Sequence, residues 1–80
     1  MPYITEEARH SPHMLNYEPH CAGELNFLIT TFIRDYYNKS PSYQSVNDVI
    51  GALEGAKLEF YRRVAAPYED TKVIQNGDVY

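Results

Sequence analysis

The sequence predicts an all-α fold, an antiparallel two-helix hairpin with an extended N-terminal arm and a C-terminal tail, assembled as a homo-oligomer. Two stretches, 22–38 and 46–66, place apolar residues three and four positions apart, which is the spacing of one helix face. A short polar segment, KSPSYQ, joins them and has a normal length for a connection between antiparallel helices. Eighty residues make one domain at most. Because one hairpin has a single interface to offer, we expect its other apolar faces to meet a second copy.

The first 21 residues predict an irregular arm. They contain three prolines and three histidines, and no apolar period of 2 or 3.6 is sustained. A short helical turn is expected over 4–9. Arms of this kind are disordered alone or packed on a partner subunit.

The first long helix is predicted over 22–38. Glu24 stands in its first turn, where a negative charge suits the helix dipole. The β-branched residues in ITTFI favour a strand locally, but the apolar spacing outweighs that preference. The residues with helical spacing are Leu25, Leu28, Ile29, Phe32, Ile33 and Tyr36.

The second long helix is predicted over 46–66. Ser45 is the expected N-cap, with Asp48 three residues later as in a capping box. Pro67 is expected to end the helix, because it lacks the amide hydrogen that a continuing helix would use. Ion pairs are expected on its outer surface between Glu54 and Lys57, and between Glu59 and both Arg62 and Arg63.

Two glycines stand one turn apart in this helix, although each costs ~1 kcal/mol relative to alanine. Gly51, Ala52, Gly55 and Ala56 together form a smooth patch of small side chains that lets another backbone approach closely. Three uses remain open. Large rings of the first helix, such as Phe32 or Tyr36, lie over the patch; a second subunit crosses there; or a ligand lies against the exposed backbone.

The tail, 67–80, contains the tight-turn signal Asn76-Gly77 between two short apolar pieces. We expect a hook or a strand-like extension that docks on another surface. A freely disordered tail is the competing interpretation.

Composition excludes several classes of protein. Seven Lys and Arg stand against eleven Asp and Glu, a net charge of −4, which argues against a duplex-binding protein. The N-terminus has no signal peptide pattern, and no apolar stretch is long enough to span a membrane. A single cysteine, Cys21, excludes a disulfide within the chain and suits a reducing cytoplasm.

No metal, cofactor or enzymatic activity is expected. His10, His13, His20 and Cys21 are metal-ligand types, but their spacing matches no standard zinc pattern, and surface histidines on a flexible arm are the simpler interpretation. The sequence contains no recognisable set of nucleophile, base and orienting group, and no glycine-rich phosphate loop.

The end of the second helix holds the candidate ligand-binding residues. Arg62 and Arg63 suit the negative end of the helix dipole. Their functional interpretation is a guanidinium fork that recognises phosphate, with Tyr61 or Tyr68 stacking on a base or holding its edge.

The segments LNFLITTFI at 25–33, SYQSVNDVIGALEGAKLEFYRRVAAPYEDTK at 42–72 and NGDVY at 76–80 resemble a family of short, uncharacterised proteins of tailed bacteriophages and prophages. The resemblance implies a phage gene expressed in the cytoplasm of a bacterial host and brings no catalytic residues with it. A looser resemblance, of fold alone, is to the helical hairpins of phage sponge proteins, which assemble into oligomers and sequester nucleotide second messengers.

Together these features predict a non-enzymatic phage accessory protein that acts by binding. Its leading ligand is a cyclic nucleotide or an ADP-ribose-type immune second messenger. One alternative is a protein-protein inhibitor of a host or defence enzyme, whose acidic charge and tyrosine-rich arms would mimic another surface. The other alternative is a minor component of virion assembly.

Overall fold

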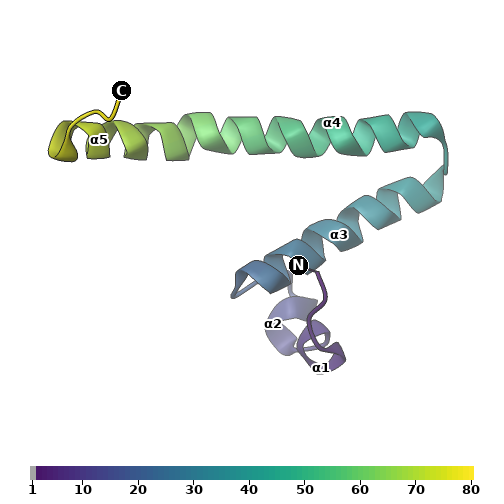
Figure 1. Cartoon of the computed structure of the whole chain (residues 1–80). Helices are drawn as coiled ribbons and strands as arrows, with labels where there is room; N and C mark the ends of the chain where they lie inside the picture. Colours follow the sequence, from purple (N-terminus) through teal and green to yellow (C-terminus); the bar gives the residue numbers. More distant parts are fainter. Residues whose placement is uncertain (1) are drawn as a thin grey trace. The chain divides into compact units, whose positions relative to one another are not determined.

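A computed structural model describes residues 2–80, and all regular structure in that range is helical, as the sequence predicts (Figure 1). The chain divides into two compact units, Met1–Val46 and Asn47–Tyr80, which are described separately. The antiparallel pairing of the long helices and the homo-oligomer stay predictions. The elements are α1 (Glu6–Arg9), α2 (Pro12–Leu15), α3 (Ala22–Lys39), α4 (Tyr43–Phe60), the π-helical turn η1 (Tyr61–Ala65) and α5 (Ala66–Asn76).

Helix α3 is the main element of the first unit and confirms the predicted helix over 22–38 to within one residue. Its side chain Leu28 is 7% exposed, and Met14 of α2 is 3% exposed. These two are the buried apolar residues of the part of the chain that the structure describes. The unit therefore has a very small apolar core, placed between the arm and α3.

The N-terminal arm is more ordered than the sequence predicts. The turn expected over 4–9 is present as α1, capped by Thr5, whose Oγ1 accepts a hydrogen bond of 3.0 Å from the Ala8 amide. A second helical turn, α2, was not predicted; it begins with Pro12, which is pre-organised for a first helical position. The contacts of the arm with α3 include two aromatic ones, with the Arg9 guanidinium 5.9 Å from the Phe27 ring centre and the Tyr17 and Phe32 rings 5.7 Å apart.

The start of α4 corrects the predicted cap. Helix α4 begins at Tyr43, so Ser42 is the N-cap in place of Ser45. The Ser42 Oγ accepts a hydrogen bond of 3.1 Å from the Ser45 amide, and the Ser45 hydroxyl donates to the carbonyl oxygen of Ser40 at 2.6 Å. Ser45 is itself buried. Ser42 is the N-cap because its hydroxyl oxygen reaches the amide of Ser45, which would otherwise lack a partner at the helix start.

Pro67 does not end the second helix, contrary to the prediction. The π-turn η1 precedes it, with the Ala66 amide bonded to the carbonyl oxygen of Tyr61 five residues back. Pro67 then lies in the first turn of α5, where no amide hydrogen is needed. The widened turn separates the proline ring from the carbonyl groups of the preceding turn, and the helix continues to Asn76.

The C-terminal segment is therefore mostly helical, and the predicted strand-like or disordered tail is wrong for residues 67–76. Asn76-Gly77 marks the end of a helix, which is a different use of the same turn signal. Gly77 has a φ of 87°, a conformation that glycine adopts without strain, and its amide donates to the Val73 carbonyl oxygen at 2.8 Å.

The unit Asn47–Tyr80 has no buried residue. It nevertheless carries large apolar side chains along α4, η1 and α5. The exposed apolar residues of this unit include Ile50, Leu53, Leu58, Phe60, Val64 and Ile74.

Among residues 2–80, no helix combines the length and the apolarity that crossing a membrane requires.

The two glycines of α4 are open to solvent. A Cβ atom built on Gly51 or Gly55 has no neighbouring atom within 4 Å. At about 100° per residue, both glycines lie roughly 160° around the helix axis from Leu53. The patch of small residues, Gly51 to Ala56, has no covering residue in its own unit, and its role as a contact surface stays a prediction.

Alanine at either glycine should therefore stabilise the protein. We expect Gly51→Ala and Gly55→Ala each to raise the free energy of unfolding by ~1 kcal/mol, because alanine is the better helix former and its methyl group meets nothing. Urea denaturation followed by circular dichroism measures the change. Lower stability or a changed oligomeric state in either variant would show instead that another backbone packs closely on this patch.

Candidate functional site

The residues predicted to bind a ligand lie at the π-turn and just after it. Tyr61, Arg62 and Arg63 belong to η1, and Tyr68 belongs to α5. All four side chains are exposed. The structure brings them into one stretch of helix, as the sequence implies, and provides an internal partner for each of them.

Both arginines pair with one carboxylate. Glu59 Oε2 accepts from Arg62 and Glu59 Oε1 accepts from Arg63, which confirms the ion pairs predicted from spacing. The Glu54–Lys57 pair is also present, at 3.8 Å. Because both arginine side chains are 72% exposed, these pairs contribute little stability. A phosphate would have to displace Glu59 to use the two guanidinium groups together.

The Tyr61 hydroxyl donates a hydrogen bond of 2.6 Å to Glu69 Oε1, eight residues later. In a regular α-helix, residues eight apart are rotated by about 80° around the axis. The extra residue in the π-turn shifts this offset by about 100° in the opposite direction. The two side chains are then only about 20° apart around the axis, which is nearly in line. The Tyr61–Glu69 bond is therefore a consequence of η1, and the sequence spacing gave no sign of it.

The hydrogen bond to the Glu69 carboxylate raises the pKa of Tyr61, and the nearby negative charge acts in the same direction. Tyr68 is engaged differently, because the Lys72 ammonium group lies 5.5 Å from the centre of its ring. Such a cation–π contact at an exposed site is weak, about 0.5–1 kcal/mol. Both rings remain available for stacking on an added ligand.

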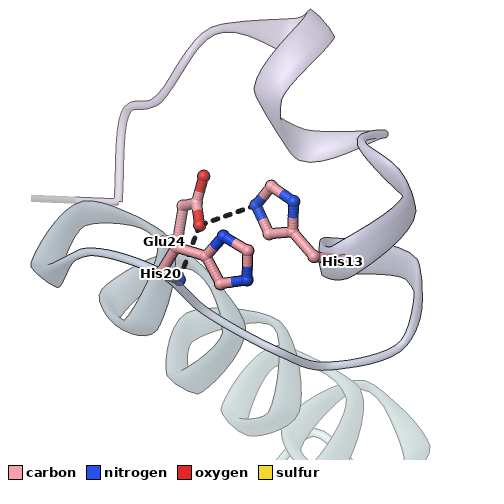
Figure 2. Close-up of side chains that lie close together, drawn as sticks. All are labelled: His13, His20 and Glu24. Atoms are coloured by element: carbon pink, nitrogen blue, oxygen red, sulfur yellow. Dashed lines mark hydrogen bonds and ion pairs between the residues drawn. The ribbon is translucent and has the colours of Figure 1, made fainter.

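A second cluster lies in the first unit, where two histidines of the arm meet the start of α3 (Figure 2). His13 belongs to α2, His20 to the segment that precedes α3, and Glu24 to the first turn of α3. Figure 2 shows the carboxylate of Glu24 and both imidazole rings pointing toward one another. One potential ligand atom from each side chain lies within 4.8 Å of the other two.

One oxygen of Glu24 organises this cluster. Oε1 lies 2.9 Å from His13 Nε2 and accepts a hydrogen bond of 2.8 Å from the His20 backbone amide. The rings of His13 and His20 stack with their centres 3.8 Å apart and their planes 8° from parallel. The Glu24 side chain is 12% exposed and that of His13 is 26% exposed, so the pair is partly shielded from water.

Glu24 is in place because of the helix start. Cys21 is the N-cap and makes no side-chain hydrogen bond. Glu24, three residues later, reaches back past the N-cap amide, which the acidic member of a capping box would bind, and accepts from the amide of His20 instead. The backbone hydrogen bond from His20, and then the hydrogen bond from His13, hold the pKa of Glu24 below its usual value.

Of the four potential metal ligands singled out in the sequence, the structure brings only two together. His13 and His20 come together, whereas the His10 ring lies 3.0 Å from the Glu6 carbonyl oxygen and Cys21 is exposed at the helix start. Glu24 was predicted only as a favourable charge for the helix dipole. Its place three residues after the N-cap was the available signal that its carboxylate would face the chain segment before α3.

A family model described as a domain of unknown function (DUF6899) matches residues 1–79. Comparison with curated proteins and with solved structures finds no significant match.

The Tyr61–Glu69 bond predicts a measurable pH dependence. Because the folded pKa of Tyr61 is raised, the bond stabilises the fold fully below the ordinary tyrosine pKa of about 10 and is lost as the pH rises through the folded pKa. Glu69→Gln should bring the pKa of Tyr61 back toward its ordinary value. The absorbance of tyrosinate measures this titration, and Tyr61→Phe identifies which transition belongs to Tyr61. Pro67→Ala should act in the same direction by allowing a regular helix. An unchanged titration in Glu69→Gln would contradict the bond.

Proposed function

Because the chain belongs to the DUF6899 family, whose function is unknown, we propose a function from its own surfaces. It is a non-enzymatic phage accessory protein that assembles with itself through α4 and acts by binding in the cytoplasm of its bacterial host. The phage setting comes from the sequence resemblance described above. The assembly is supported by one observation, an apolar seam that runs along α4 into η1 and that nothing in its unit covers.

The seam consists of Ile50, Leu53, Phe60 and Val64, with Lys57 among them. Their positions alternate steps of three and four residues, the spacing at which helices pack along one line. The four apolar side chains are between 39% and 65% exposed. Leaving such surface in water costs about 25 cal/mol per Å² of apolar area, and helices in proteins gain most of their stability by packing such a face.

A second copy is the partner that this pattern suits best. Isoleucine followed by leucine three residues later is typical of the paired positions of two-stranded coiled coils, and a single lysine in such a seam restricts register and oligomeric state. The seam ends at Val64 within η1, because the one-residue insertion of this turn rotates every later side chain off the line. The contact we propose is therefore short and ends before α5.

Assembly is tested by a pair of leucines on the same helix. Leu53 lies in the seam, whereas Leu58 is 57% exposed and lies about 140° away around the axis. We expect Leu53→Asp to weaken self-association at least ~100-fold, because it places an unpaired charge in an apolar contact. Leu58→Asp should leave the oligomer intact. Sedimentation velocity and native mass spectrometry measure both. A wild-type monomer, or an oligomer that tolerates Leu53→Asp, would contradict the proposal.

The second candidate function is sequestration of a nucleotide second messenger at the π-turn. The observation that favours it is the presence of two guanidinium groups and two exposed tyrosine rings within one short segment. Guanidinium groups bind phosphate with two parallel hydrogen bonds, and tyrosine faces stack on bases. Glu59 is the internal competitor for the same cations.

Because Glu59 competes with the ligand for the two arginines, removing Glu59 and removing the arginines should change ligand affinity in opposite directions. If cyclic dinucleotides, cyclic trinucleotides or cyclic ADP-ribose isomers bind here, Glu59→Gln should tighten binding by freeing both guanidinium groups. Arg62→Ala with Arg63→Ala should weaken it by about tenfold or more, since a hydrogen bond to a charged group contributes ~1.5–3 kcal/mol. Lys57→Ala is the matched control. Isothermal titration calorimetry measures affinity, and circular dichroism checks the fold.

If the Arg62 and Arg63 double variant keeps full affinity for a nucleotide, these arginines are not the site. If none of the nucleotides binds the wild-type oligomer, the result favours a protein partner over a nucleotide ligand. A pull-down from host lysate then tests the inhibitor alternative, and mass spectrometry of purified particles tests the virion-component alternative.

A further inference from the structure

We propose that His13, His20 and Glu24 form a binding site for a divalent transition-metal ion of the zinc type, which ties the N-terminal arm to the first turn of α3. Two imidazole nitrogens and one carboxylate oxygen make a ligand set that suits Zn²⁺ and its neighbours better than Mg²⁺ or Ca²⁺. The three side chains come from three separate segments of the arm and α3, so the ion would join parts of the chain that are otherwise held by few contacts.

The spacing of the donor atoms fits an ion. Around a tetrahedral zinc ion with bonds of ~2.0–2.1 Å, neighbouring ligand atoms lie about 3.3–3.4 Å apart, so an ion between His13 and Glu24 would widen that pair by only a few tenths of an ångström. His13 Nε2 and Glu24 Oε1 are 2.9 Å apart, and all three donor atoms lie within 4.8 Å of one another. An ion would take the place of the proton that His13 and Glu24 now share as a hydrogen bond. The His20 ring, now stacked on His13, would turn to direct a nitrogen at the same point.

The carboxylate is already oriented for this role. The His20 backbone amide donates to Glu24 Oε1 and fixes the side chain at the start of α3. Outer hydrogen bonds of this kind typically orient metal-binding carboxylates. The stacked rings, with their centres 3.8 Å apart, keep both imidazoles beside this carboxylate.

The small core of this unit makes an added tie useful. Met14 and Leu28 are its buried apolar residues within the described range, and the single cysteine excludes a disulfide. Domains of this size commonly gain stability from a bound metal when apolar burial is insufficient. A plain His13–Glu24 hydrogen bond, serving structure alone, is the competing account of the same geometry.

Zinc titration of the full chain, after treatment with a chelator, separates the two accounts. We expect one Zn²⁺ per chain by calorimetry, and for Co²⁺ the visible absorption of a protein-bound ion. His20→Ala is the cleanest variant, because the His20 side chain is exposed and makes no hydrogen bond with residues 2–80. The substitution should weaken zinc binding at least ~10-fold. His13→Ala should do the same. Circular dichroism of each metal-free variant checks that the fold is kept.

Two controls remove the other possible ligands. His10→Ala and Cys21→Ser should leave zinc affinity unchanged, because neither residue belongs to the cluster. Loss of binding in His20→Ala and His13→Ala, with both controls unaffected, supports the site. Absence of saturable zinc binding, binding that survives both histidine variants, or binding lost in Cys21→Ser would each overturn it.

Discussion

The scarcity of buried apolar surface is the constraint on which the other features of this protein depend. Within residues 2–80, only Met14 and Leu28 are buried apolar side chains, and nothing from Asn47 onward is buried. Backbone hydrogen bonds within helices cannot replace that burial, because a helix without a packed face is marginal in water. Polar contacts within the arm therefore carry more of the order of the first unit than apolar burial does. Both of our proposals, assembly along the apolar seam and a metal site at the start of α3, address this shortage.

Glu24 shows how one polar side chain can serve several purposes in so small a unit. Its oxygen supplies an acceptor at a helix start that Cys21 does not cap, fixes the segment before α3, and meets the imidazole of His13. Each of these contacts orders a part of the arm that has little apolar area to bury. The same combination of a partly shielded carboxylate and two imidazoles is the basis of the metal site that we propose, so order and the proposed binding depend on one group.

Much of the helical structure follows from local sequence, whereas the contacts of the site do not. The apolar spacing of 22–38 predicted α3 because periodicity is a property of neighbouring residues. Glu59 was paired correctly with both arginines for the same reason. Pro67 was misjudged because a π-turn compensates for the proline, and no single-residue preference signals such a turn. The meeting of His13 with Glu24 depends on how the arm returns to α3, which spacing along the sequence does not determine.

The π-turn also has a consequence for how related chains should differ in length. Helix α4 runs into α5 with one residue more than a regular ladder of hydrogen bonds would need. A related chain that lacked one residue between 61 and 65 would lose no loop, since there is none to shorten. It would instead turn the whole of α5 by about 100° about its own axis and present a different set of side chains beyond Ala65. In this segment, a gap of one position in an aligned relative should therefore be interpreted as a change in the face that α5 presents.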